Sequence, residues 1–207
     1  MNWRTGGLKL YAIVDASYFP CTQQLLAAAE ELVNVGVKIV QYRNKAGDPG
    51  KMLAHARELR IRVGSRATLI MNDRVDLCLA AEFDGVHVGQ DDLSPEAARR
   101  IVGPEKWLGV STHNPEQVAD AEASVADYVA VGPVFATASK ANPDPVIGLD
   151  GVRRARELTR KPLVAIGGIT RANCRSVIQA GADSVAVISD LVRAPGKSAE
   201  EFLRILG

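Results

Sequence analysis

At Thr68-Leu69-Ile70-Met71-Asn72-Asp73-Arg74, a short apolar run leads directly into an amide, an acid and a base. An apolar run of this length predicts a buried strand. In parallel α/β folds, ligands bind at the carboxyl ends of the strands. Asn72 and Asp73 are therefore the first candidates for a binding site.

Seven further apolar runs flank this strand, and helix-compatible segments separate them. The runs are residues 10–14, 37–42, 85–88, 107–110, 128–131, 163–166 and 184–188. Strict alternation of strands and helices predicts a parallel sheet, and eight such units predict a closed (β/α)8 barrel. A doubly wound open sheet is the alternative, but no strand is followed by Gly-x-Gly-x-x-Gly.

Helix signals lie between the runs. Apolar spacing predicts helices at 23–35, 49–63, 74–81 and 150–158, and a closing helix at 198–206. Ser94-Pro95-Glu96 and Asn114-Pro115-Glu116 each combine a capping residue, a proline and an acid, which is typical of a helix start. Thr170 is expected to cap a helix that ends near Ala180.

An internal repeat supports the barrel. The pattern Asp-x-Val-x-Val begins at Asp84, Asp127 and Asp183, on the predicted fourth, sixth and eighth strands. We interpret the chain as one barrel domain over residues 1–207. Residues 1–8 are an N-terminal lead-in, and residues 132–147 are a long loop at the expected active-site face.

Composition excludes several classes of function. The 207 residues carry a net charge of +1, which favours neither nucleic acid nor an anionic membrane as a partner. No apolar run approaches the length of a membrane span, and no signal peptide is evident. Cys21, Cys78 and Cys174 show no metal-ligand spacing, so we expect free thiols in the cytoplasm. The oligomeric state stays open, with a homo-oligomer among the options.

The last two strands end in small residues, Gly167-Gly168 and Ser189. In (β/α)8 barrels, the loops after strands seven and eight commonly bind phosphate through backbone N–H groups. Glycine lets the backbone approach the phosphate oxygens. We therefore expect a phosphate site here, and a simple tight turn at Gly167-Gly168 is the alternative.

Two carboxylates, Asp73 and Asp92, follow neighbouring strands. Mg²⁺ is typically bound by one or two carboxylates together with waters and substrate phosphate oxygens. Capping of the following helix explains Asp73 equally well at this stage.

Gln41, Arg43 and Lys45 alternate along one strand and so lie on one side, while Lys140 lies in the long loop. Such a set fits a diphosphate, although Lys140 alone fits a solvated charge equally well.

The histidines are weak signals. We expect His87 and His113 to be packing or helix-start residues and His55 to be exposed, because none has a partner nearby in sequence. No Gly-x-Ser-x-Gly, His-Glu-x-x-His or phosphate-binding P-loop motif is present.

Seven short motifs, in order along nearly the whole chain, resemble those of the thiamine phosphate synthase family. They are Gln41-x-Arg43-x-Lys45, Asn72-Asp73-Arg74, Gly89-Gln90-Asp91-Asp92, Gly109-Val110-Ser111, Thr137-x-Ser139-Lys140, Gly167-Gly168-Ile169 and Val187-Ile188-Ser189. Each motif is weak alone, and seven in sequence are specific. The family is a (β/α)8 barrel of transferases that join a pyrimidine diphosphate to a thiazole phosphate and release diphosphate.

The resemblance implies a role for each matching residue. The pyrimidine diphosphate would contact Gln41, Arg43, Lys45, Asn72, Ser111 and Lys140. Mg²⁺ would be held by Asp73 and Asp92. The thiazole phosphate would contact Thr137, Ser139, Gly168, Ile188 and Ser189. Ser111, Lys140 and Arg43 would act most directly in catalysis.

The chain departs from the family pattern in two places. The loop reads Ala136-Thr137-Ala138-Ser139-Lys140, where the family usually has Pro-Thr-x-Thr-Lys. Tyr42 replaces a smaller aliphatic residue, and we expect its ring to point toward the helices. A thiazole tautomerase on the same barrel and a non-catalytic thiamine phosphate binder are alternative functions. Barrels of tryptophan biosynthesis also share the phosphate site, but they need an acid–base pair that these strand ends do not offer.

Overall fold

The computed structural model describes residues 8–137 and 144–207 of the chain. Within these residues the strands are β1 (Leu10–Asp15), β2 (Ile39–Arg43), β3 (Thr68–Asn72), β4 (Gly85–Val88), β5 (Trp107–Thr112), β6 (Tyr128–Val131), β7 (Leu163–Ala165) and β8 (Ser184–Val187). They pair in parallel and in chain order, and β8 closes on β1. The predicted (β/α)8 barrel is therefore confirmed.

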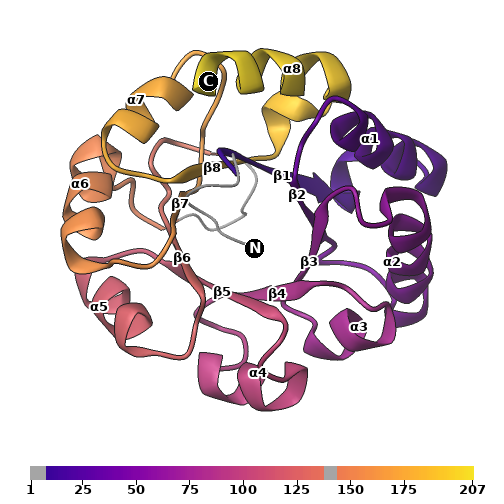
Figure 1. Cartoon of the computed structure of the whole chain (residues 1–207), viewed down its shortest axis with the longest axis horizontal. Helices are drawn as coiled ribbons and strands as arrows, with labels where there is room; N and C mark the ends of the chain where they lie inside the picture. The colour runs from indigo at the N-terminus through magenta and orange to yellow at the C-terminus, as the bar shows by residue number, and fades with distance from the viewer. Residues whose placement is uncertain (1–7, 138–143) are drawn as a thin grey trace.

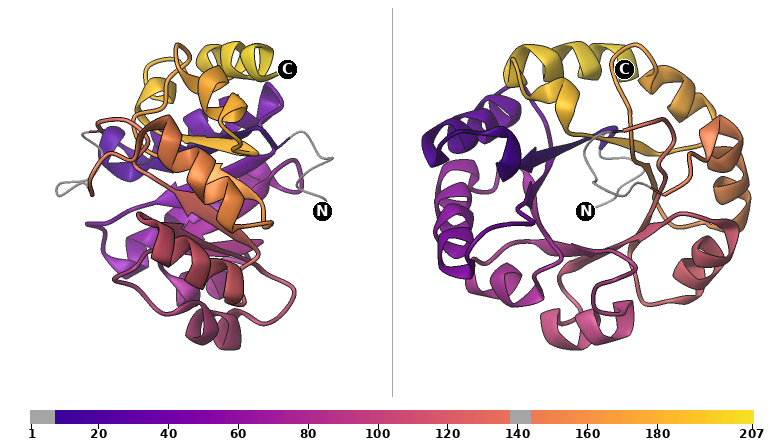
Figure 2. Two further views of the ribbon diagram at one scale, coloured as in Figure 1. Left: turned by 90° about the vertical axis from the view of Figure 1, so that its left-hand side faces the viewer. Right: turned by 180° about the vertical axis from the view of Figure 1, so that it is seen from behind.

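Helices form an outer ring around the strands (Figures 1 and 2). They are α1 (Thr22–Asn34), α2 (Pro49–Val63), α3 (Val75–Ala80), α4 (Pro95–Val102), α5 (Pro115–Ala123), α6 (Gly148–Leu158), α7 (Cys174–Gln179) and α8 (Pro195–Leu206). Two short 3-10 helices, η1 (Ala16–Tyr18) and η2 (Ser189–Leu191), follow β1 and β8. None of the described helices is long and apolar enough to span a bilayer.

Several element ends differ from the sequence prediction by one to four residues, and three of them have a clear physical reason. Thr170 does not cap a helix: its N–H donates to Asn173 Oδ1 at 2.8 Å within a turn, and α7 begins only at Cys174. Helix α8 begins at Pro195 rather than Ser198, because proline fits the first helical turn. Strand β5 continues through Ser111 to Thr112, since both residues pair with β6.

Apolar side chains fill two separate layers. Inside the barrel, Tyr11, Ile70, Tyr128 and Val164 pack together, so the barrel is a core and not a pore. A larger cluster lies between the strands and the helices. Tyr42 belongs to this outer layer, and its hydroxyl lies 3.0 Å from His55 Nδ1 on α2, so its predicted direction is confirmed. His55 also contacts Thr22, and the prediction that it is exposed was wrong.

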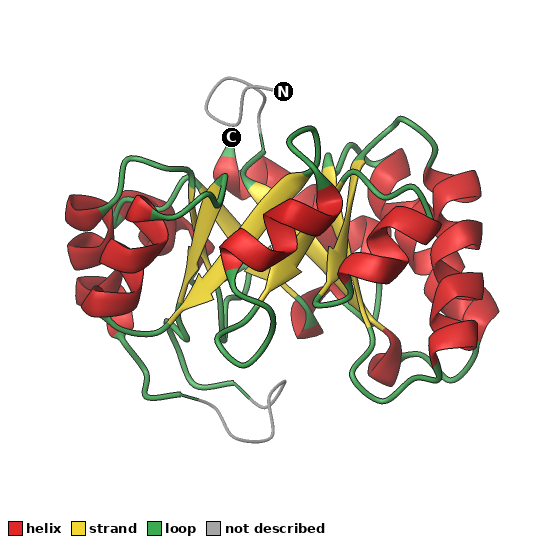
Figure 3. Cartoon of the chain, turned by 90° about the horizontal axis from the view of Figure 1, so that it is seen from below, coloured by secondary structure: helices red, strands yellow, loops and turns green. Residues whose placement is uncertain are grey.

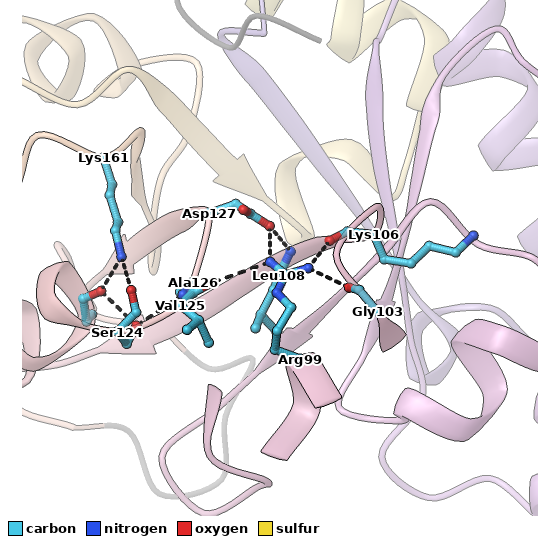
Figure 4. Close-up of polar contacts among 10 residues, drawn as sticks. Arg99, Gly103, Lys106, Leu108, Ser124, Val125, Ala126, Asp127 and Lys161 are labelled. Atoms are coloured by element: carbon cyan, nitrogen blue, oxygen red, sulfur yellow. Dashed lines mark hydrogen bonds and ion pairs between the residues drawn. The ribbon is translucent and has the colours of Figure 1, made fainter. Parts of the chain in front are cut away.

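The repeated aspartates form one motif at the edge where the strands begin. Asp127 Oδ2 accepts from Leu108 N at 2.7 Å and from Arg99 Nη2 at 2.6 Å (Figure 4). Asp183 Oδ2 likewise accepts from Leu163 N and Arg156 Nη1, and Asp84 Oδ2 accepts from Leu69 N and forms an ion pair with Arg60. We call these three arrangements the aspartate clamps. Each ties the end of one helix to two consecutive strands.

The clamps and the polar strand ends lie on opposite sides of the barrel. The C-terminus lies on the clamp side, at the edge from which the strands start (Figure 3). Lys9 Nζ, just before β1, bonds the carbonyl oxygens of Leu206 and Gly207 there. The carboxyl ends of all eight strands therefore share the other rim, which is where the predicted site residues were expected.

Candidate active site

Asn72 and Asp73 lie at the carboxyl end of β3, and each has an unusual feature. For Asn72 it is a buried amide, and for Asp73 it is the backbone conformation. Asn72 is only 8% exposed, and its Nδ2 has no hydrogen-bond partner among the described residues. A buried amide N–H without an acceptor is costly, so the position suits a bound acceptor. Asp73 has a positive φ of 61°, a conformation that asparagine and aspartate tolerate best among non-glycine residues. Its N–H donates to His87 O at 2.7 Å, which anchors the turn to β4.

Asp73 does not cap the following helix. The residue at the cap position of α3 is Arg74, and no side chain makes a capping bond there. The Asp73 carboxylate instead lies 2.5 Å from Lys45 Nζ. Burial raises the pKa of the Asp73 carboxyl to about 6; Lys45 opposes this shift, and the neighbouring Asp92 carboxyl adds to it. Two carboxylates from adjacent strands thus face each other at this rim.

The loop after β4 holds Asp92 in place. Asp92 Oδ2 accepts from Gly89 N at 2.8 Å, so one oxygen is fixed by the backbone. Gln90 Nε2 donates to Ser111 O at 2.6 Å and ties this loop to β5. Asp91 is exposed.

The carboxylate pair is of the kind that could contribute to a Mg²⁺ site. Among the described residues, no group of three or more His, Cys, Asp or Glu side chains gathers as a metal site. Structural zinc and calcium sites usually need more protein ligands than two. Mg²⁺ keeps several waters and takes substrate phosphate oxygens, so Asp73 and Asp92 are a sufficient protein contribution.

Strand β2 supplies the cations and an amide. Arg43 pairs with Asp15 at the end of β1, where Asp15 is 1% exposed and also accepts from Ser17 N and Oγ. Lys45 is 52% exposed beyond the strand end. Gln41 lies deeper, is 3% exposed, and donates to Tyr11 Oη at 2.8 Å. The predicted same-side arrangement of these three residues therefore holds.

Ser111 lies at the end of β5 beside a histidine. Its Oγ is 2.8 Å from His87 Nε2. The prediction that His87 is a packing residue is incomplete, because His87 is buried and also contacts Tyr128 Oη. Strand pairing could have found this contact, since His87 and Gly109 lie opposite each other on β4 and β5.

The strand ends of β7 and β8 are joined by ion pairs. Gly167 and Gly168 have φ values of 90° and 65°, and a Cβ on Gly168 would lie 2.5 Å from Ala136 O. Glycine is therefore required by both backbone conformation and close packing. Arg171, after β7, donates two hydrogen bonds, from Nε and Nη2, to the carboxylate of Asp190 in η2. This contact ties the Gly167-Gly168 turn to the segment of Ile188 and Ser189, and the sequence reasoning missed it.

The long loop after β6 is described only at its two ends. Thr137 is half-buried, whereas Ser139 and Lys140 lie outside the described residues, as do residues 1–7 of the lead-in. His113 Nδ1 is 2.5 Å from Gly132 O, and His113 Nε2 is 3.4 Å from Asp144 Oδ2. His113 therefore contacts both ends of the loop.

Comparison with known proteins identifies the family. The family model described as thiamine monophosphate synthase matches residues 10–191. The chain is 61% identical to a thiamine-phosphate synthase of Koribacter versatilis, over 96% of this chain and 95% of that protein. It is 42% identical to the Methanosarcina mazei thiamine-phosphate synthase, over 87% of this chain and 76% of that protein.

A solved structure agrees with this match. Thiamine phosphate pyrophosphorylase from Pyrococcus furiosus superposes with a TM-score of 0.88 and 35% identity, and the alignment covers 99% of this chain and 98% of that one. The chain therefore belongs to the thiamine monophosphate synthase family.

Proposed function

We propose that the chain joins hydroxymethylpyrimidine diphosphate to the ring nitrogen of a thiazole phosphate, giving thiamine phosphate and diphosphate. The observation that carries the proposal is the gathering of opposite charges at one rim. Lys45 pairs with Asp73, Arg43 pairs with Asp15, and the buried amide nitrogen of Asn72 has no acceptor in the part of the chain that the structure describes. Such a site suits a substrate with several anionic oxygens.

The pyrimidine diphosphate is assigned to the ends of β2, β3 and β5. Arg43 presents a planar fork to the diphosphate oxygens, and Lys45 and Lys140 add charge. The Asn72 amide donates to one of these oxygens, which satisfies its buried N–H. Gln41 and Ser111 contact the pyrimidine ring and the diphosphate that leaves it. These preorganised donors stabilise the negative charge that grows on the diphosphate as its bond to carbon breaks.

Asp73 and Asp92 are the residues that would hold Mg²⁺. The ion, when bound, would supply positive charge to the leaving diphosphate. Burial and the neighbouring Asp92 carboxyl raise the pKa of Asp73, and Lys45 lies against it. A divalent cation would complement the charge of the two carboxylates.

The thiazole phosphate is assigned to the loops after β6, β7 and β8. Its contacts would come from Thr137, Ser139, Gly168, Ile188 and Ser189. The positive φ of Gly168 and the Arg171–Asp190 contact hold these loops in a fixed relation. Phosphate binding at this position is common in (β/α)8 barrels.

The reaction proceeds without a protein nucleophile. The diphosphate leaves first, and the thiazole nitrogen then attacks a cation stabilised by the pyrimidine ring. The protein holds the two substrates in line and keeps water from the cation. The loop of residues 132–147 would cover the site during this step.

Two further assignments belong to this proposal. The partners are small molecules, and the chain acts in the cytoplasm, where Cys21, Cys78 and Cys174 would remain the free thiols seen here. A homo-oligomer is one of the assemblies consistent with this function.

One assay tests the function. The protein is supplied with the pyrimidine diphosphate, the thiazole phosphate with or without its carboxylate, and Mg²⁺, and both products are measured. We expect stoichiometric thiamine phosphate and diphosphate. Isomerisation of the carboxylated thiazole without coupling would identify a tautomerase, and binding of thiamine phosphate without turnover would identify a sensor. Arg43, Lys45, Asp73 and Asp92 argue against the tautomerase.

A further inference from the structure

A chain of hydrogen bonds crosses the barrel interior from β2 to β5. Gln41 Nε2 lies 2.8 Å from Tyr11 Oη, which lies 2.9 Å from Tyr128 Oη. Tyr128 Oη lies 3.0 Å from His87 Nδ1, and His87 Nε2 lies 2.8 Å from Ser111 Oγ. All of these residues except Ser111 are at most 8% exposed. We call this set the core relay.

One arrangement of the protons gives each of these four contacts one donor and one acceptor. The Gln41 amide nitrogen can only donate, so Tyr11 Oη accepts from it. In this arrangement Tyr11 donates to Tyr128, and Tyr128 donates to His87 Nδ1. The neutral imidazole carries its one proton on Nε2 and donates it to Ser111 Oγ. Ser111 accepts this bond, which leaves its own proton to point away from His87.

Burial favours the neutral form of every member. The His87 ring is buried, which disfavours the charged imidazolium. Burial also raises the pKa values of the Tyr11 and Tyr128 hydroxyls, so both keep their protons. The arrangement of protons above therefore needs no charged member.

The backbone of β5 makes room for the relay. A Cβ on Gly109 would lie 2.0 Å from Tyr128 Cζ, so only glycine lets the Tyr128 ring lie at this position. Tyr128 and His87 lie with ring centroids 5.5 Å apart. Tyr11 and Tyr128 are 6.1 Å apart in an edge-to-face arrangement, which is a favourable geometry for aromatic rings. Packing thus holds the donors and acceptors in place.

We propose that His87 is a positioning residue that fixes the Ser111 hydroxyl as a hydrogen-bond donor toward the substrate. Gln41, Tyr11 and Tyr128 hold the imidazole in the tautomer that this requires. The inference rests on the proposed function, because Ser111 meets substrate only if that function holds. The relay also joins Gln41 to Ser111, two residues assigned to the same substrate from strands β2 and β5.

Two substitutions at residue 87 separate positioning from packing. In His87→Asn, the side chain still offers an acceptor to Tyr128 but cannot reach Ser111. In His87→Gln, the amide nitrogen reaches the place of Nε2 and can donate to Ser111. We expect His87→Asn to lose roughly ten- to hundredfold in kcat, with smaller changes in KM, and His87→Gln to recover most of the loss. The control Thr112→Val removes the neighbouring buried hydroxyl, which bonds Ala130 O, and should keep the original kcat.

A double-mutant cycle tests whether His87 acts through Ser111. His87→Asn should cost little further activity in a Ser111→Ala background. Equal losses in both backgrounds, or a His87→Gln variant as impaired as His87→Asn, would overturn the proposal. A purely structural role gives equal losses in both backgrounds.

A measurement on the protein alone keeps this test separate from the function assay. The tautomer of His87 is read from long-range proton–nitrogen spectra of the ¹⁵N-histidine protein, with the signal assigned by its absence in His87→Gln. We expect the Nε2–H tautomer at pH 7. An Nδ1–H tautomer or a charged ring would overturn this arrangement of the protons, whether or not thiamine phosphate is formed.

Discussion

Lys45 Nζ and Asp73 Oδ2 lie 2.5 Å apart across the ends of β2 and β3. One is the cation assigned to the diphosphate, and the other is an acid assigned to Mg²⁺. In the protein without ligands they neutralise each other. Binding of a magnesium diphosphate would replace this contact with two new ones, Asp73 to the ion and Lys45 to the phosphate, so little charge is left unpaired in either state.

Asp73→Asn is expected to lower kcat by roughly a hundredfold or more, because the growing charge on the diphosphate loses its stabilisation. Asparagine tolerates the positive φ of this position, so the fold should survive. Activity is measured over a Mg²⁺ titration, and the melting temperature checks the fold. The matched control is Asp91→Asn, an exposed carboxylate one residue from Asp92. Activity equal to that of the unmodified protein at every Mg²⁺ concentration would remove Asp73 from the metal site.

Asp15→Asn is expected to weaken binding of the pyrimidine diphosphate. Asp15 is buried and pairs with Arg43, so its charge holds the guanidinium in one orientation. We expect the KM for this substrate to rise roughly tenfold while the KM for the thiazole phosphate stays nearly constant. Steady-state kinetics with each substrate varied in turn make the comparison. Equal effects on both KM values would point to a general loss of structure instead.

The stability of the protein should depend on pH through His87. Its pKa falls from the ordinary value of 6.5 to about 4 on burial, so the unfolded chain binds a proton that the folded chain does not. The contribution is fully present above pH 6.5 and is lost as the pH falls toward 4, by at most roughly 3 kcal/mol. Denaturant unfolding at several pH values is compared with that of His87→Gln. The difference between the two proteins should change over this range, and a constant difference would contradict a buried neutral ring.

Asp127→Ala should destabilise the protein without changing kcat. It removes the side-chain acceptor of Leu108 N and the ion-pair partner of Arg99 at the edge opposite the site. Loss of a charged acceptor for a half-buried donor costs about 2 kcal/mol, which lowers the melting temperature of a chain of this size by roughly 4–8 °C. Asp120→Ala on the exposed face of α5 is the control and should melt like the original. A reduced kcat in Asp127→Ala at low temperature would contradict a role confined to stability.

The sequence predicted the barrel and its strand ends because both follow from local patterns. Short apolar runs identify buried strands, and the polar residues after them, such as Asn72 and Asp73, must lie at the carboxyl rim. Alternation along β2 placed Gln41 and Arg43 on one side for the same reason.

Contacts between distant strands were not predictable in this way. Tyr11 and Tyr128 read as ordinary apolar strand residues, because the bond between their hydroxyls joins positions 117 residues apart. Asp15 was not identified, and His87 was undervalued, for the same reason. Thr170 was misread because Asn173 offers its side chain to the same turn, and one sequence cannot rank two neighbouring capping residues.

The aspartate clamps also bear on where this chain could be cut. They bridge the loops after α2 and α3, after α4 and α5, and after α6 and α7. The corresponding position before β2 holds Lys38 instead of aspartate, and Lys9, just before the neighbouring β1, bonds the carbonyl oxygens of Leu206 and Gly207. None of the three clamps therefore spans the part of the ring from α8 through β1 to β2. A circular permutant that links residue 207 to residue 8 and reopens at residues 35–38 leaves all three clamps intact, whereas reopening at residues 124–127 severs one.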